Sequence, residues 1–202
     1  MTTRIPAARG RPRSVSPEAV AAIAFDLFDQ QGFSATTMED IARASGVSRP
    51  TLFRYFASKG AILWFHYEER TCGFRALLFA SAPELPILDA VFETFLQQLL
   101  ERGEEQMAIT RRRIVIGLRE SGTTIGEQEH QEEWEAIVAE FIASRLGREA
   151  VDLDSRVLAS AIWNGLWTGV RAWAADEIPG EGPRSYLDRA RRLLAGSEVL
   201  GR

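Results

Sequence analysis

The chain has 202 residues, of which 46% are hydrophobic, and a formal net charge of −4 at pH 7. This length can bury one small and one medium core, so it predicts two domains. A single cysteine, Cys72, excludes an internal disulfide, and no apolar run approaches the roughly 20 residues of a membrane span. Asp26 interrupts the apolar run that follows the N-terminal arginines, so we expect no export signal and a cytoplasmic protein.

The charge is distributed unevenly along the chain. Residues 1–60 hold 8 basic and 5 acidic side chains, a net charge of +3, whereas the remaining residues carry −7. A basic N-terminal part on an acidic body is typical of a protein that contacts nucleic acid with one end.

Residues 1–15 lack apolar periodicity, and we expect a flexible basic arm there. Its segment 9–13 resembles the core of an AT-hook, a flat cationic segment that lies in the narrow minor groove of A·T-rich DNA. We therefore include Arg9, Arg11 and Arg13 among the candidate DNA contacts. The alternative is a solvated tail that DNA attracts weakly and without specificity.

The next segment, residues 16–60, predicts three short helices. Ser16 and Pro17 are the cap and first residue of a helix that ends at Gly32. Residues 36–59 then read as a helix-turn-helix: Thr36 or Thr37 caps the first helix, and Gly46 can take the left-handed conformation that ends it.

The second helix of this motif has two different faces. Ser48 caps it, and Leu52, Phe53 and Phe56 form a narrow apolar seam. The opposite face presents donors suited to the major groove of DNA, namely Arg49, Thr51, Arg54 and Tyr55.

Residues 16–62 resemble the N-terminal domain of the TetR family of bacterial repressors. The resemblance rests on Thr37, Ile41-Ala42, Gly46-Val47-Ser48, Thr51-Leu52-Phe53, Tyr55-Phe56 and Ser58-Lys59, with Phe53 in place of the family's more usual Tyr. It implies that Thr37, Ser48, Tyr55 and Lys59 hold phosphates. It also places Arg49 and Thr51 near base edges, with Arg54 a further candidate.

Residues 61–202 predict a helical body. A long helix is expected from residue 58 to about residue 80. We assign the aromatic cluster at 64–67 to packing at the domain junction, with ligand contact as the alternative. Further helices are expected at about 87–102, where Gly103 ends the helix, at 105–119 and 126–146, from Asp152 or Asp154 onward, and at 186–194. The prediction is an all-α protein of about nine helices.

The long helix after residue 152 carries more apolar residues than one face can hold, which indicates a second subunit. Ala161, Gly165 and Gly169 are small residues four positions apart, which permits close approach of another helix. In the TetR family the last two long helices of each chain form a four-helix dimer interface. We therefore expect a homodimer, with Ile142 and these three residues at its interface.

A looser resemblance concerns the ligand. The segments at 111–114, 134–143 and 145–147 resemble an actinobacterial branch of the family that includes mycofactocin-cluster regulators, whose effectors are long-chain acyl-CoA thioesters. An acyl chain needs an apolar tunnel and the CoA phosphates need cations. The candidate pocket residues are Phe92, Phe95, Met107, Arg111, Arg112, Arg113, Phe141, Trp163 and Trp167. Alternatively, these aromatics are core residues and the arginines pair with surface glutamates.

The leading hypothesis is a homodimeric repressor that a small lipophilic molecule releases from a pseudo-palindromic operator. One alternative is a sensor of a drug-like compound that controls an efflux gene, and a remote one is a helical enzyme. We find no recognisable set of nucleophile, base and orienting group, so we expect no catalysis. His66 and His130 lack a metal-ligand spacing, and no cofactor motif is present, so neither metal nor cofactor is expected.

Overall fold

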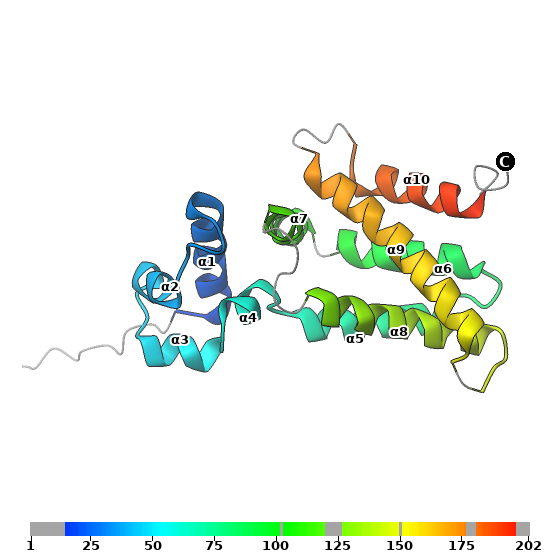
Figure 1. The fold of residues 1–202 in the computed structure, drawn as a ribbon, viewed down its shortest axis with the longest axis horizontal. Helices are drawn as coiled ribbons and strands as arrows, with labels where there is room; N and C mark the ends of the chain where they lie inside the picture. Colours follow the sequence, from blue (N-terminus) through cyan, green and yellow to red (C-terminus); the bar gives the residue numbers. More distant parts are fainter. Residues whose placement is uncertain (1–14, 102, 120–126, 150, 177–180, 197–202) are drawn as a thin grey trace, which may run out of the picture. The chain divides into compact units, whose positions relative to one another are not determined.

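The computed structural model describes residues 15–101, 103–119, 127–149, 151–176 and 181–196. Over these ranges the protein is all-α, with ten helices and no strand. The chain divides into two compact units, Met1–Ile62 and Leu63–Arg202. The element order is shown in Figure 1.

Unit 1 contains α1 (Pro17–Gln31), α2 (Met38–Ser45) and α3 (Arg49–Tyr55), followed by the start of α4 (Lys59–Leu63). Local signals set these bounds. The Ser16 hydroxyl accepts a hydrogen bond from the Ala19 amide at 3.2 Å, and Gly46 ends α2 in the left-handed region with φ +66°. The three helices predicted for this segment are confirmed.

The core of unit 1 is small and largely aromatic. Its buried apolar side chains include Val20, Ala24, Phe25, Phe28, Phe33, Ile41, Leu52 and Phe56. Phe53 is a correction to the predicted seam, because its side chain is 42% exposed. The seven-residue α3 presents one narrow inward stripe, which Leu52 fills and Phe53 lies outside.

The long helix expected from residue 58 to about 80 is divided in two. α4 ends at Leu63, α5 (Tyr67–Phe79) begins four residues later, and His66 between them has φ +63°. A hydrogen bond from the Tyr67 amide to the Trp64 carbonyl at 2.8 Å closes the turn. At this break the Leu63 carbonyl accepts a hydrogen bond from Arg113, 50 positions away in the sequence, and local helix propensity does not contain that information.

Unit 2 adds α6 (Ile87–Glu101), α7 (Gly103–Arg119), α8 (Glu127–Arg145), α9 (Leu153–Ala175) and α10 (Pro183–Ala195). α9 packs against both α8 and α10 (Figure 1). Gly103 opens α7 with φ +77° instead of only ending the helix before it. α10 begins at Pro183, three residues before the predicted start at residue 186, because proline suits the first position of a helix.

The described ranges contain neither a membrane-spanning helix nor a cluster of metal-binding side chains. None of the described helices has the length and apolar content needed to cross a membrane. No group of three or more His, Cys, Asp or Glu side chains among the same residues could hold a metal ion.

Candidate functional site

The helix-turn-helix is held by reciprocal caps. The Thr37 hydroxyl accepts from the Asp40 amide at 3.1 Å, and the Asp40 carboxylate accepts from the Thr37 amide at 3.0 Å. These bonds from Thr37, together with Arg43, lower the pKa of Asp40 below its usual range. At α3, Ser48 accepts from the Thr51 amide at 3.3 Å, and their hydroxyls lie 2.8 Å apart. The candidate phosphate contacts Thr37 and Ser48 are therefore cap residues.

The outward face of α3 is cationic and aromatic. The Arg49 guanidinium lies 5.6 Å from the centroid of the Phe53 ring, and that of Arg54 lies 5.3 Å from the Tyr55 ring. Arg49 and Arg54 are exposed, whereas Tyr55 is half-buried. Rings beneath the guanidiniums restrict their rotamers, so this face offers partly ordered donors in the free protein.

Lys59 has an additional role within unit 1. Its ammonium donates to the Phe33 carbonyl at 2.6 Å and to the Ser34 carbonyl at 3.3 Å, and it lies 4.7 Å from the Phe33 ring centroid. It therefore fixes the loop between α1 and α2. The arm residues Arg9, Arg11 and Arg13 lie outside the described residues.

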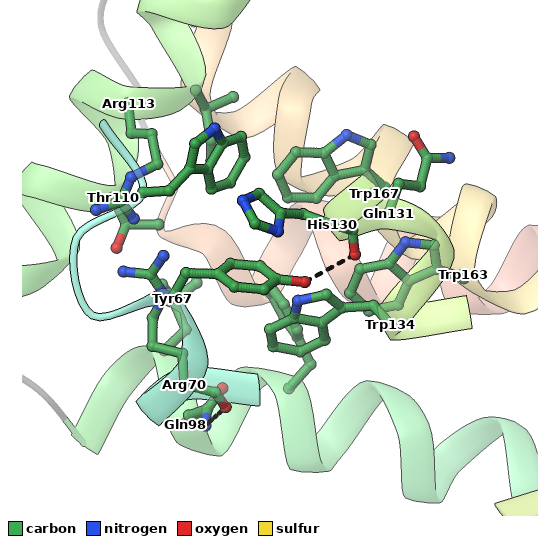
Figure 2. A pocket seen from close by; sticks show the side chains of 14 residues that line it. Tyr67, Arg70, Gln98, Thr110, Arg113, His130, Gln131, Trp134, Trp163 and Trp167 are labelled. Atoms are coloured by element: carbon green, nitrogen blue, oxygen red, sulfur yellow. Dashed lines mark hydrogen bonds between the residues drawn. The ribbon is translucent and has the colours of Figure 1, made fainter. Parts of the chain in front are cut away.

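A cavity of about 90 Å³ lies inside unit 2 (Figure 2). α5, α6, α7, α8 and α9 all contribute to it, together with the turn between α4 and α5. Its lining residues are Trp64, Tyr67, Arg70, Phe95, Gln98, Leu99, Thr110, Arg113, Ile114, His130, Gln131, Trp134, Trp163 and Trp167. The cavity is thus mainly aromatic, with a few polar groups, which is the usual composition of a small-molecule site.

Stacked rings form the cavity wall. The rings of Trp134 and Trp163 lie 4.9 Å apart at 21°, and those of Trp163 and Trp167 lie 6.4 Å apart at 9°. Trp163 and Trp167 are one turn apart on α9, as the sequence predicts. Such parallel faces can stack against a flat or extended apolar group that enters the cavity.

Tyr67 and His130 join two walls of the cavity. Their ring centroids lie 3.6 Å apart, and the Tyr67 hydroxyl donates to the His130 carbonyl at 2.8 Å (Figure 2). Burial raises the pKa of Tyr67, so the hydroxyl stays protonated and remains a donor. This bond ties α5 to α8.

Two arginines provide the cationic part of the lining. Arg113 is only 7% exposed, and its guanidinium donates to the main-chain carbonyls of Leu63 and, at 3.5 Å, Phe65. Arg70 also donates to the Phe65 carbonyl, at 3.2 Å. Both arginines therefore bind the main chain of the turn between α4 and α5.

The cavity also contains a donor that lacks an acceptor. Nε1 of Trp163 is buried and has no hydrogen-bond partner among the described residues. A buried unpaired donor is costly and calls for an explanation. An oxygen on a bound ligand would supply the missing acceptor.

The predicted pocket agrees with this cavity in part. Phe95, Arg113, Trp163 and Trp167 line it. The other five predicted residues lie elsewhere, namely Phe92, Met107, Arg111, Arg112 and Phe141. Phe92 and Phe141 are buried in the hydrophobic core and do not line the cavity. Arg112 is half-buried and lines neither this cavity nor the second one described below.

Met107 and Arg111 line a separate hollow of about 310 Å³ beside Trp173 and Pro183. There Arg111 donates to the carbonyls of Ala174, at 3.2 Å, and Asp176. Arg111 therefore caps the C-terminal end of α9, where carbonyls lack helical partners. The three consecutive arginines point in different directions because successive residues of a helix are about 100° apart.

Sequence reasoning missed several lining residues, above all Trp64, Tyr67, Arg70, His130 and Trp134. The aromatic cluster at 64–67, which we assigned to packing, contributes two of them. A usable signal was the position of Arg70, one helical turn after Tyr67 of that cluster.

The expected dimer residues have a different environment. Ile142 is fully buried in its own chain. A Cβ at Gly165 would lie 2.6 Å from Leu194, and one at Gly169 would lie 3.2 Å from the Tyr186 carbonyl. These glycines therefore permit close approach of α10 of the same chain, and their place in a dimer interface stays a prediction. Ala161 is exposed.

Comparison with known proteins agrees with this architecture. Residues 21–63 match the family described as bacterial regulatory proteins, tetR family, and residues 85–198 match the MftR C-terminal domain. The Mycobacterium tuberculosis protein named mycofactocin biosynthesis transcriptional regulator MftR is 29% identical over 174 residues, which are 83% of this chain and 84% of the relative.

Two solved structures share the fold. FadR from Thermus thermophilus, solved in complex with lauroyl-CoA, has a TM-score of 0.58 and 22% identity over 91% of this chain and 95% of that one. NalD, the secondary repressor of the MexAB-OprM multidrug efflux pump in Pseudomonas aeruginosa, has a TM-score of 0.61 and 16% identity over 89% and 93%. The match to the MftR C-terminal domain covers more than half of this chain. The chain therefore belongs to the TetR family of DNA-binding transcriptional regulators, which are not enzymes.

Proposed function

We propose that this regulator is a homodimeric repressor that binds a pseudo-palindromic operator and leaves it when a lipophilic effector enters the aromatic cavity of unit 2. The observation that carries the proposal is the coexistence of an exposed cationic recognition helix and a buried, mainly aromatic cavity in one chain. Each unit has one of the two properties that a ligand-responsive repressor requires.

On the DNA side, α3 enters the major groove. Arg49 and Thr51 reach base edges, and Thr37, Ser48 and Tyr55 hold phosphates. Arg54 and the arm residues Arg9, Arg11 and Arg13 add charge. Lys59 contributes mainly by fixing the loop before α2, since its ammonium binds the carbonyls of Phe33 and Ser34.

The dimer forms through α9 and α10. α9 leaves large apolar side chains exposed at helical spacing: Leu153 is 74%, Val157 57% and Leu158 45% exposed. Ala161 continues this face, and α10 exposes Leu193. An apolar helical face of this kind is a recognised mark of an interface. The dimer sets two recognition helices about 34 Å apart, one turn of B-DNA.

The effector is an elongated apolar molecule such as a long-chain acyl-CoA. The relative named for mycofactocin regulation and the FadR structure with lauroyl-CoA make this class the first to test. The 90 Å³ cavity is smaller than the about 300–1,000 Å³ of ligand sites. An effector of this class therefore has to displace lining side chains.

The test is fluorescence anisotropy of the dimeric protein on its own upstream DNA. The complex should form, weaken steeply with salt, and dissociate when low micromolar lauroyl-CoA is added. Absence of a specific complex would overturn the repressor proposal. A complex that lauroyl-CoA leaves intact would overturn the acyl-CoA assignment alone.

The parallel tryptophans favour one competing effector class. Flat aromatic drug-like compounds can stack against the indole faces of Trp134, Trp163 and Trp167 that line the cavity. Such a sensor would control an efflux gene. A panel of planar compounds, ranked beside lauroyl-CoA by the rise in melting temperature, separates the two classes.

A further inference from the structure

Each main-chain carbonyl from Leu63 to His66, at the turn between α4 and α5, accepts a hydrogen bond. The Trp64 carbonyl accepts from the Tyr67 amide at 2.8 Å, and the His66 carbonyl accepts from the Arg70 amide at 3.1 Å. The remaining two, on Leu63 and Phe65, accept from guanidiniums. Without Arg113, the carbonyl of the buried Leu63 at the end of α4 would lose this donor.

The same two guanidiniums line the aromatic cavity. Arg113 reaches it from α7 and Arg70 from α5 (Figure 2). A ligand in the cavity would therefore compete with the carbonyls of the turn for the same donors. His66, with φ +63°, makes this turn a strained segment that depends on its surroundings.

We propose that Arg113 and Arg70 are the effector's anion receptor and that they also hold the α4–α5 turn. An anionic group in the cavity takes the guanidiniums from the carbonyls of Leu63 and Phe65, and the turn is released. This inference rests on the proposed ligand-responsive function, and it names the chemistry of the effector's head group and the residues that detect it.

The exchange is favourable on elementary grounds. A guanidinium binds a carboxylate or phosphate oxygen more strongly than a neutral carbonyl, and it can do so with two parallel bonds. Because the cavity has a volume of only about 90 Å³, an entering ligand has to displace side chains, and the long arginine side chains can rotate. The Nε1–H of Trp163, which has no partner among the described residues, can donate a hydrogen bond to a second polar group of the ligand.

Release of the turn acts on a short helix. α4 has five residues, begins in unit 1 and ends in unit 2. Its first residue, Lys59, donates to carbonyls of unit 1, and its last, Leu63, accepts from Arg113. Loss of the hydrogen bond between Arg113 and Leu63 frees the C-terminal end of α4, which directly follows the DNA-binding unit in the chain.

The anion has two possible sources, the carboxylate of a free acid or a phosphate of a CoA thioester. Titration of the protein with laurate, lauroyl-CoA and dodecanol, followed by tryptophan fluorescence, separates them. We expect at least one anionic probe to bind about tenfold more tightly than dodecanol, the typical effect of one charged hydrogen bond. Laurate as the tighter probe identifies the carboxylate, and lauroyl-CoA the phosphate.

The decisive variant is Arg113→Gln. It should remove the preference for the anionic probe, and hydrogen exchange of the Tyr67 amide should become about tenfold faster without ligand. In the wild type, the bound anion should accelerate the same amide. Arg111→Gln is the matched control on the same helix, and it should alter exchange near residue 174 instead. Arg113→Lys keeps the charge but loses the planar guanidinium that can make two parallel bonds, so it should retain part of the preference.

The two proposals fail in different ways. If dodecanol binds as tightly as the anions, or if Arg113→Gln keeps both the preference and slow exchange at Tyr67, the receptor role of Arg113 is wrong even when ligands still release DNA. If no probe binds, exchange in Arg113→Gln still decides whether the arginine holds the turn, and unchanged exchange overturns it. If the protein forms no complex with its upstream DNA, the proposed function fails whatever the arginines bind.

Discussion

The indole of Trp134 on α8 lies nearly parallel to that of Trp163 on α9, with 4.9 Å between ring centroids and 21° between planes. Both side chains are buried and both line the cavity. This pair therefore joins the stability of unit 2 to its capacity to hold a ligand.

Truncation of this stack should destabilise the protein strongly. We expect Trp163→Ala to lower the free energy of unfolding by about 3–5 kcal/mol, because it removes a buried indole and enlarges the cavity. Urea denaturation followed by circular dichroism measures the change. Trp163→Phe should cost less, since a ring remains opposite Trp134, and equal losses in the two variants would show that the stack contributes nothing.

Arg49 should carry base recognition. We expect Arg49→Ala to weaken operator binding by about 1–3 kcal/mol while binding to nonspecific DNA falls less. Competitive anisotropy with operator and scrambled duplexes gives both values. Arg75→Ala removes the same charge from α5, where Arg75 pairs with Glu140 at 2.5 Å, and should leave operator affinity unchanged. Equal losses in the two variants would reduce Arg49 to general electrostatics.

The exposed face of α9 should hold the dimer. We expect Val157→Glu to give monomers in sedimentation velocity and to weaken operator binding, because a charge enters an apolar interface. Leu100 on α6 is comparably exposed, at 41%, and Leu100→Glu should remain dimeric. A dimeric Val157→Glu protein would place the interface elsewhere.

Close packing of α10 on α9 should make Gly169 intolerant of a methyl group. A Cβ there would meet the Tyr186 carbonyl and the Ala190 Cβ at 3.2 Å, and backbone cannot move aside cheaply. We expect overpacking of about 1–3 kcal/mol in Gly169→Ala, partly offset by about 1 kcal/mol of helix propensity. Thermal denaturation tests the net loss, and Ala172→Gly, at an exposed position of α9, calibrates the propensity term.

Asp40 should contribute to stability in a pH-dependent way. Its pKa is lower in the folded protein than the about 3.9 of a free side chain, so its contribution is complete above pH 3.9 and is lost as the pH falls through the folded pKa. We expect Asp40→Asn to be less stable than wild type near neutral pH, with the gap closing below about pH 3.9. Urea titrations at several pH values measure it, and a gap independent of pH would assign the loss to capping geometry alone.

The helix-turn-helix could be predicted from local sequence. Its caps at Ser16, Thr37 and Ser48 and the left-handed Gly46 act within three or four residues of the chain. Interactions at that range are visible in a sequence pattern. The apolar periodicity of the body helices is local in the same sense, and for this reason their existence and approximate bounds were predicted.

What the sequence determined by itself is therefore the all-α class, the DNA-binding motif and the stack of Trp163 on Trp167, all of which depend on short spacings. The tertiary structure alone decided the rest: where the expected long helix is divided, Arg113, 50 positions beyond Leu63, donates to the Leu63 carbonyl, while Arg111 binds the end of α9. It also placed α10 over Gly165 and Gly169. The direction in which an arginine points, and which helix covers a glycine, depend on how distant elements pack, and periodicity along one helix carries no record of its neighbours.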